Sequence, residues 1–161
     1  PEKVLALAEA LRPQSVQLQY QETPEDAAFP CRHLNPCGIQ VIKAVAFPDG
    51  SGRSLEEFFS LCSGYCRAGV SALVLDSRHA GNAAEKARPA DLSLYRTLQS
   101  SLDRPVILAG GLTPENLGGI VKEAAPYAVD VLSGVEDFPG KKSPQKVRDF
   151  MRVAFCPSNS K

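Results

Sequence analysis

Two pairs of small residues, Gly110-Gly111 and Ser133-Gly134, each follow an apolar run of the kind that forms a buried strand. Glycine lets backbone amides approach a ligand closely, and a helix start at Thr113 offers further free amides to an anion. The alternative is that each pair only makes a sharp turn between a strand and a helix. Because two such turns follow successive strands, we favour a phosphate-binding site formed by both turns.

Three charged residues occur next to or inside apolar runs, where a charge is costly to bury without a partner or a chemical role. Asp76 follows Ala72–Leu75 at a strand end, where it could donate a proton as a general acid or merely cap the next turn. Asp130 is expected inside a strand and therefore needs a partner or a ligand. Lys43 is better explained as a member of an interior ion pair than as a catalyst.

The five cysteines are an odd number without paired spacing, which is typical of a reducing compartment. Cys62 and Cys66 are four residues apart in a helical pattern, so we expect them to be buried on one helix face. Cys31, His33 and Cys37 could form a metal cluster, but no second cysteine pair at zinc spacing accompanies them. We therefore expect no metal site.

Apolar, β-branched runs alternate with helical patterns along the chain, which predicts repeated β-α units on a parallel sheet. The near-continuous apolar character of these runs indicates strands covered on both faces. The carboxyl ends of parallel strands share one edge of the sheet, and ligands bind at that edge in α/β proteins. The five predicted strands are 16–20, 39–47, 72–77, 105–111 and 128–134.

Helix starts are marked by local capping signals. Ser54 with Glu57 three residues later forms a capping box, and Thr113-Pro114 and Ser143-Pro144 each combine a capping residue with proline at the first helical position. Glu2–Leu11 is also predicted to be a helix.

Length and composition predict a single domain over residues 1–161, with a polar tail at 156–161. The 161 residues are 43% hydrophobic, enough for one core. Basic and acidic residues both number 18, so no bulk charge attracts nucleic acid or an anionic membrane. No apolar run approaches the ~20 residues of a membrane span, and no signal-peptide pattern is present. We expect a soluble, cytoplasmic protein.

Several of these stretches together resemble the phosphoribosylanthranilate isomerase family. The similarity runs from the first residues to about Phe155, and the two long stretches around the small-residue pairs are specific in combination. The matching stretches are Val16–Leu18, Val41–Ala44, Leu73–Ser77, Leu108–Asn116 and Val129–Lys142.

The resemblance implies a TIM (β/α)8 barrel fold, a phosphorylated small-molecule substrate and no metal or organic cofactor. The implied reaction is the Amadori rearrangement of N-(5-phosphoribosyl)anthranilate to 1-(2-carboxyphenylamino)-1-deoxyribulose 5-phosphate in tryptophan biosynthesis. It also implies that Asp76 is the general acid and that Asp130 contacts the substrate. Gly110-Gly111 and Ser133-Gly134 match the phosphate site, and Gln19, at a position where the family has histidine, is a possible substrate contact.

The chain departs from the family pattern because it has only about five β/α units and lacks the first three strands. The general base of the family is a cysteine in a Cys-Gly-Ile motif that ends the first strand. Cys37-Gly38-Ile39 precedes a strand here, and we interpret it as a coincidence. We expect an incomplete barrel, completed by a missing N-terminal segment or by a homo-oligomer, and weak or no isomerase activity from this chain alone.

Two other functions are compatible with the same residues. One is a catalytically inactive barrel module that binds phosphate or oligomerises. The other is a different phosphate-binding barrel, such as a thiamin phosphate synthase relative, because small-residue turns are shared widely among such barrels. The run Leu132–Gly140 argues against the second.

Overall fold

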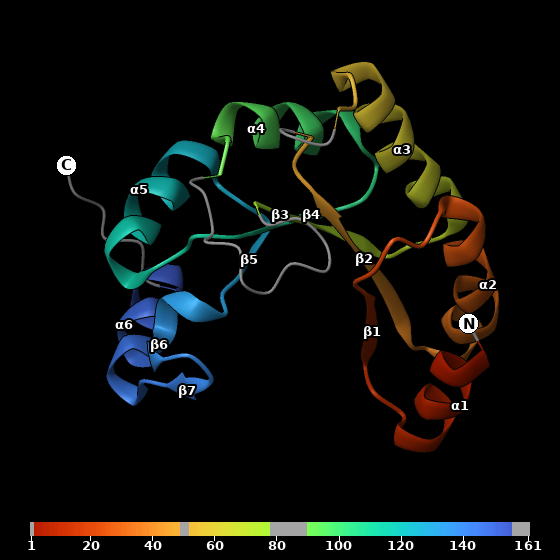
Figure 1. The fold of residues 1–161 in the computed structure, drawn as a ribbon, viewed down its shortest axis with the longest axis horizontal. Helices are drawn as coiled ribbons and strands as arrows, with labels where there is room; N and C mark the ends of the chain where they lie inside the picture. The colour runs from red at the N-terminus through yellow and green to blue at the C-terminus, as the bar shows by residue number, and fades with distance from the viewer. Residues whose placement is uncertain (1, 49–51, 78–89, 156–161) are drawn as a thin grey trace.

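The computed structural model describes residues 2–48, 52–77 and 90–155. Within these ranges, five strands form one parallel sheet whose spatial order equals the chain order (Figure 1). This confirms the predicted parallel α/β class. Each strand is shorter than predicted, most of all β5. The strands are β1 (Ser15–Leu18), β2 (Gln40–Ala46), β3 (Ala72–Asp76), β4 (Val106–Ala109) and β5 (Ala128–Asp130).

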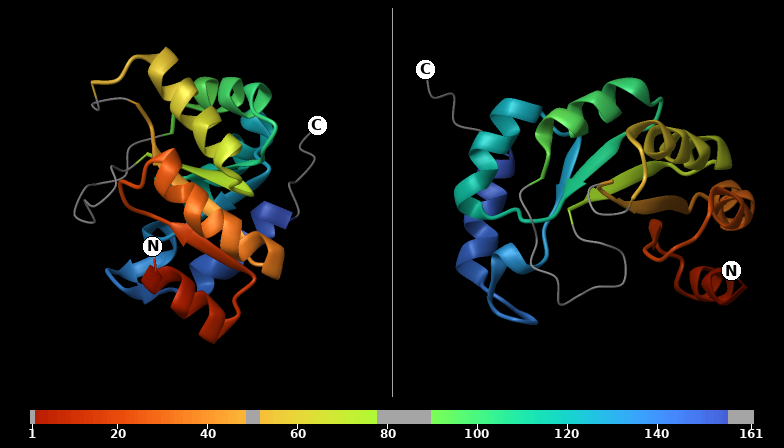
Figure 2. Two further views of the ribbon diagram at one scale, coloured as in Figure 1. Left: turned by 90° about the vertical axis from the view of Figure 1, so that its right-hand side faces the viewer. Right: turned by 45° about the horizontal axis from the view of Figure 1, so that its top comes forward.

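The helices lie along one side of the curved sheet, as Figures 1 and 2 show. They are α1 (Glu2–Leu11), α2 (Pro24–Leu34), α3 (Leu55–Ala68), α4 (Leu92–Ser101), α5 (Pro114–Ala124) and α6 (Pro144–Phe155), with short 3-10 turns η1 (Asn35–Cys37) and η2 (Ser133–Val135). The capping box predicted at Ser54 is present, and the capping residue predicted at Thr113 forms a capping box with Asn116. A third, at Thr23 with Asp26, starts α2, which the sequence reading did not identify.

The two faces of the sheet are covered differently. On the face toward the helices, Val41, Leu73 and Leu108 are almost completely buried in the main core. On the opposite face Ala44 and Val74 form part of a second, much smaller apolar cluster, with isoleucines of β2 and β4 only partly buried beside them. No helix among the described residues covers this second face (Figure 1). Strand β3 is nevertheless buried along its whole length, so the expectation of burial on both faces holds for this strand.

Lys43 is buried on the helix side of β2, with a side chain only 2% exposed. Its ammonium group donates hydrogen bonds to the Tyr20 carbonyl (2.7 Å) and the Glu22 carboxylate (2.8 Å), and it lies 5.6 Å from the centre of the Tyr65 ring. The Tyr65 hydroxyl in turn donates to the Glu22 carbonyl at 2.5 Å. These contacts confirm the predicted interior ion pair and fix the β1–α2 connection to β2 and α3.

Tyr95 of α4 is fully buried and its hydroxyl connects three segments. The hydroxyl donates a hydrogen bond to the Val106 carbonyl in β4 at 2.7 Å and accepts one from the Tyr127 amide at 3.3 Å, just before β5. A buried hydroxyl needs such partners because desolvation without them is costly.

The predicted strand over 128–134 is wrong beyond Asp130. The chain there turns through η2 and then forms an antiparallel hairpin of β6 (Glu136–Phe138) and β7 (Lys141–Lys142). The hairpin turn contains Pro139-Gly140, and Gly140 adopts a φ of 83° that glycine accommodates without strain. Lys141-Lys142 thus forms the second strand of this hairpin, with both side chains exposed.

Lys142 stabilises the start of this hairpin. Its ammonium group donates to the Leu132 carbonyl at 2.6 Å and to the Glu136 carboxylate at 2.8 Å. The bond from Lys142 is the main reason why the pKa of Glu136 lies below its ordinary value of 4.5. The predicted polar tail at 156–161 lies outside the described residues.

The described helices are all too short or too polar to cross a lipid bilayer.

Candidate functional site at the carboxyl edge of the sheet

Asp76, Ala109 and Asp130 form a row across β3, β4 and β5. Asp76 pairs in register with Ala109, and Ala109 pairs with Asp130. Residues in register on parallel strands point to the same face, so both aspartates belong to the face that the helices leave uncovered. Adjacent strands lie about 4.8 Å apart, which places the two aspartate backbones roughly 10 Å apart.

The two aspartates have different surroundings. Asp76 is buried, with 6% of its surface exposed. Asp130, which the sequence predicted to be enclosed within a strand, is instead the exposed last residue of β5. The prediction failed because it extended β5 through Gly134, so Asp130 does not need a partner to compensate for burial.

The turns after β4 and β5 are in direct contact. A Cβ atom at Gly134 would lie 1.7 Å from the Leu112 carbonyl oxygen and 2.8 Å from its carbonyl carbon. No rotamer change relieves a clash with backbone, so only glycine fits at this position.

Gly110 and Gly111 meet a different requirement. Their φ angles are 91° and 64°, in the left-handed region, and a Cβ at Gly110 would lie 2.1 Å from the Ser77 hydroxyl oxygen. Turn geometry and packing therefore account for these glycines without a ligand. The glycines therefore make the sharp turn that was the alternative interpretation from sequence. The same turn also leaves backbone amides without covering side chains, which an anion site needs.

The two turns enclose a small cleft of about 10 Å³, which is enough for one water molecule. A phosphate group is larger, so it would bind at the mouth of this cleft rather than inside it. The structure thus brings five of the predicted site residues together. The cleft is lined by Ala109, Gly110, Gly111, Leu112, Asp130, Val131, Leu132, Ser133 and Gly134.

The start of α5 is built into the first turn. The Thr113 hydroxyl accepts a hydrogen bond from the Asn116 amide, and the Asn116 side chain accepts from the Thr113 amide at 2.8 Å. The same side chain donates to the Gly111 carbonyl at 2.8 Å. Asn116 therefore fixes the Gly-Gly turn, a role that the capping signal at Thr113 could have revealed.

The two other predicted residues do not line this cleft. Asp76 lies one strand away, at the end of β3, with its backbone carbonyl accepting from the Phe47 amide at 3.0 Å. Gln19 follows β1, is exposed, and accepts a side-chain hydrogen bond from Gln17. Strand β2 separates it from Asp76.

Ser77 is a polar residue of this edge that was not predicted as a site residue. It is 8% exposed, it directly follows Asp76, and its hydroxyl has no hydrogen-bond partner among the residues that the structure describes. Sequence offers no signal for such a group because its isolation depends on the packing of Gly110 against it.

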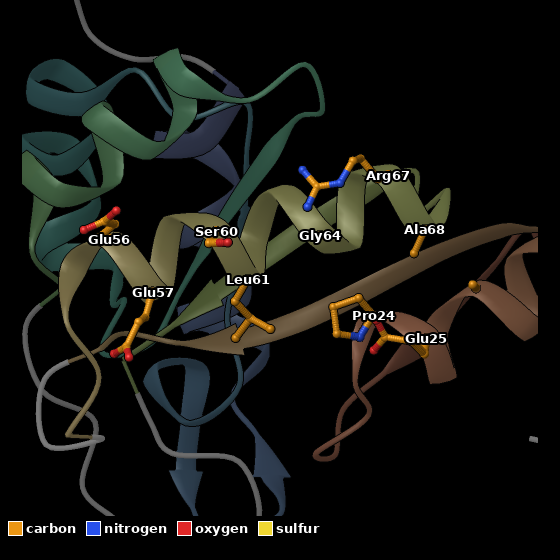
Figure 3. A pocket seen from close by; sticks show the side chains of 10 residues that line it. Pro24, Glu25, Glu56, Glu57, Ser60, Leu61, Gly64, Arg67 and Ala68 are labelled. Carbon is orange, nitrogen blue, oxygen red and sulfur yellow. The ribbon is translucent and has the colours of Figure 1, made fainter.

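A much larger hollow, of about 740 Å³, lies elsewhere on the described surface. Figure 3 shows that its lining side chains come from α3, including Glu57 and Arg67, and from the start of α2. It contains none of the predicted site residues and lies in the helix layer.

Residues 1–153 match the family described as N-(5'phosphoribosyl)anthranilate (PRA) isomerase. The N-(5'-phosphoribosyl)anthranilate isomerase of Methanopyrus kandleri is 39% identical over 142 residues, covering 86% of this chain and 63% of the relative. That of Halobacterium salinarum is 36% identical over 157 residues, covering 96% of this chain and 66% of the relative. The chain thus spans about two thirds or less of the length of these relatives.

Solved structures agree with this result. The phosphoribosyl anthranilate isomerase of Thermotoga maritima superposes with a TM-score of 0.74 at 32% identity, covering 96% of this chain and 68% of that chain. A thiamine phosphate pyrophosphorylase of Pyrococcus furiosus shares only the fold, with a TM-score of 0.66 at 16% identity. From the matched stretch and these relatives, this chain belongs to the N-(5'-phosphoribosyl)anthranilate isomerase family.

Proposed function

We propose that this chain takes part in the Amadori rearrangement of N-(5'-phosphoribosyl)anthranilate in tryptophan biosynthesis. In this proposal, the turns at Gly110-Gly111 and Ser133-Gly134 bind the substrate phosphate, and Asp76 is the general acid. Asp130 contacts the substrate near the phosphate, and Gln19 is a more distant contact. The reaction requires no metal or organic cofactor.

The chemistry needs an acid at one face of the sugar and a base at the other. The carboxyl group of Asp76 donates its proton to the furanose ring oxygen while the bond from that oxygen to C1 breaks. The nitrogen lone pair of the anthranilate then forms the C1=N bond. A base removes the proton from C2, and the electron pair of the broken C2–H bond forms the C1=C2 bond while the π pair of C1=N returns to the nitrogen, which gives an enolamine. Protonation of C1 and loss of the C2 hydroxyl proton then give the ketone.

The observation that supports this proposal best is the register of the strands. It places Asp76 and Asp130 on one face of the sheet, and the two contacting turns directly follow β4 and β5. A phosphate at the mouth of the cleft would lie beyond Asp130, and the ribose would extend toward Asp76. Buried Asp76 is also better shielded from water than an exposed carboxylate, which suits proton transfer.

We further propose that the chain corresponds to the last five β/α units of the barrel. The relatives are longer than the matched stretch, which leaves about a third of their length unmatched. The general base then lies outside this chain, in the part of the relatives that it does not match. Consequently we expect weak or no turnover from the 161 residues alone.

A fused protein tests this proposal. The unmatched N-terminal part of the Methanopyrus kandleri relative is joined to the start of this chain, and conversion of N-(5'-phosphoribosyl)anthranilate is followed by the loss of its fluorescence. We expect turnover from the fusion, and we expect Asp76→Asn in the fusion to lower kcat by about 10²- to 10⁴-fold, the usual contribution of a general acid.

The matched control is Asp103→Asn, because Asp103 is exposed and lies in the connection between α4 and β4. It should leave kcat unchanged. Retention of full activity by the Asp76→Asn fusion would show that Asp76 is not the acid. A fusion that folds, binds the reduced product analogue and still has no turnover would instead favour an inactive phosphate-binding module.

A further inference from the structure

We propose that Lys142 is a positioning residue of the phosphate site. It acts on the Ser133-Gly134 turn through the Leu132 carbonyl and does not itself touch the ligand. This role rests on the proposed function, because it assumes that the turn binds the substrate phosphate. A side chain of the β6–β7 hairpin thereby joins a site that otherwise consists of two strand ends and their turns.

The cleft between the two turns has no cation among its described lining residues. The lining consists of apolar residues, glycines, one serine and a single charged group, the carboxylate of Asp130. A phosphate ester at the mouth of this cleft brings further negative charge, so backbone amides must hold it. Amides whose directions are fixed before the ligand arrives bind it more tightly, because less freedom is lost on binding.

Lys142 is held beside this cleft by two contacts. Its ammonium group donates to the Leu132 carbonyl at 2.6 Å and to the Glu136 carboxylate at 2.8 Å. The contact with Glu136 fixes the position of a side chain that is 45% exposed. The contact with Leu132 places a positive charge on the backbone oxygen of a residue that lines the cleft.

The peptide group between Leu132 and Ser133 transmits the effect of this contact. A trans peptide group is planar, and its carbonyl oxygen and its N–H point in opposite directions. No peptide bond of the described residues is cis. Because the ammonium group of Lys142 holds the Leu132 oxygen, the N–H of Ser133 points away from that ammonium group. The charge also polarises the peptide group, which makes the N–H a stronger donor to an anion.

The end of the turn has anchors of its own. Val135 is 4% exposed, and its carbonyl accepts a hydrogen bond from the Ser143 amide at 2.8 Å. The next carbonyl along the chain accepts from the Lys146 ammonium group at 2.6 Å. Since these contacts hold the end of the turn and Lys142 acts at its beginning, loss of Lys142 should reorient the Ser133 amide without unfolding the turn.

Titration calorimetry of the purified 161-residue chain with inorganic phosphate tests this role. Lys142→Met keeps the apolar stem and removes the ammonium group. We expect it to raise the Kd for phosphate about tenfold to a hundredfold, the range for one hydrogen bond to a charged group. Lys142→Arg should restore most of the binding, because a guanidinium group can donate to the same two oxygens.

Lys141→Met is the matched control. It also removes one positive charge, from the neighbouring residue, whose ammonium group lies 5.1 Å from the centre of the Phe138 ring. No contact joins Lys141 to Leu132 among the described residues. The Kd for phosphate should therefore stay within about twofold of that of the unsubstituted chain, since solvent and salt screen an exposed charge.

Glu136→Gln separates positioning of the amide from simple stabilisation of the hairpin. Glutamine can still accept a hydrogen bond from Lys142 but carries no charge, so the ion pair is lost while the contact with Leu132 remains. Phosphate should bind this variant at least as tightly as the unsubstituted chain. Weakening of phosphate binding by Glu136→Gln to the same extent as by Lys142→Met would mean that Lys142 only stabilises the hairpin, and would overturn its role.

The amide of Ser133 gives a spectroscopic readout of the same effect. In an amide correlation spectrum recorded by NMR, phosphate should shift the Ser133 resonance in the unsubstituted chain and in Glu136→Gln, but much less in Lys142→Met. Phosphate binding by Lys142→Met equal to that of the unsubstituted chain would overturn the role of Lys142 and leave the proposed function intact. An unsubstituted chain that binds no phosphate would overturn the phosphate site itself, and this role with it.

Kinetics of the fused protein distinguish this role from that of the general acid. The phosphate does not react, so it contributes equally to binding of the substrate and of the transition state. Lys142→Met should therefore raise KM and leave kcat nearly unchanged, whereas Asp76→Asn lowers kcat. A loss of kcat at constant KM in Lys142→Met would contradict a role in phosphate binding.

Discussion

At Gly134, a single missing methyl group permits the turns after β4 and β5 to touch. The Leu112 carbonyl occupies the space where any other residue would place its Cβ. Ser133 and Gly134 attract notice in the sequence as small residues, and a ligand offers one explanation for them. The structure adds a second explanation that acts even in the unliganded protein, because backbone packs against backbone.

Alanine substitution should affect stability in opposite directions at Gly134, which contacts backbone, and at Gly119, which does not. Gly134→Ala should lower the free energy of unfolding by about 1–3 kcal/mol, the cost of overpacking. Gly119→Ala should raise it by roughly 0.5–1 kcal/mol, because an added Cβ there meets nothing within 4 Å and α5 gains a better helix former. Urea denaturation of both variants provides the comparison. Equal stability of Gly134→Ala and the wild type would show that the turns are not in contact.

Among the elements, the helix starts were predictable and the strand ends were not. A helix cap is a contact between residues about three apart, so the sequence alone indicates the capping box at Ser54 and the capping residue at Thr113. A strand ends where its neighbour ends. Strand β5 pairs with β4 only opposite Ile107–Ala109, so the chain leaves the sheet after Asp130 although its sequence remains apolar.

The ion pair between β2 and the β1–α2 connection should respond asymmetrically to substitution. Glu22→Gln leaves the 2% exposed ammonium of Lys43 without a countercharge and should cost about 3–5 kcal/mol of stability. Lys43→Met should cost less, about 1–3 kcal/mol, because the side chain of Glu22 is 27% exposed and water can solvate it. Chemical denaturation at neutral pH measures both losses. A larger loss for Lys43→Met would contradict the assignment of the buried charge.

In the whole molecule, the alternation of strands and helices predicted the architecture, because each β-α unit buries apolar surface against its neighbours. The sequence could not predict which face of each strand packs against the helices. Val74 and Leu73 are adjacent and equally hydrophobic, yet only Leu73 faces the helix layer. The sequence predicted a site of small residues and carboxylates at one edge of the sheet. The contact between the two turns and the register that sets the two aspartates in one row became visible only in the structure.

Thiol reactivity measures how far solvent and reagents can reach the core between the sheet and the helices. Burial raises the pKa of Cys62 to about 12 and also raises the pKa of Cys66 and Cys31, so these thiols are protonated and inaccessible. Cys37 is exposed. In a Cys156→Ser background we expect a disulfide reagent to modify one thiol rapidly at pH 8 and the others only upon unfolding. Rapid modification of two or more thiols would indicate a loosely packed layer.

The hydroxyl of Tyr95 bridges α4, β4 and the residue that leads into β5. The amide that it binds at Tyr127 belongs to a segment at the margin of the sheet, where fraying would otherwise begin. By giving that amide a partner from the buried core, one phenol ties the residue that leads into β5 to both α4 and β4, so slow hydrogen exchange at Tyr127 is expected only while all three segments stay packed.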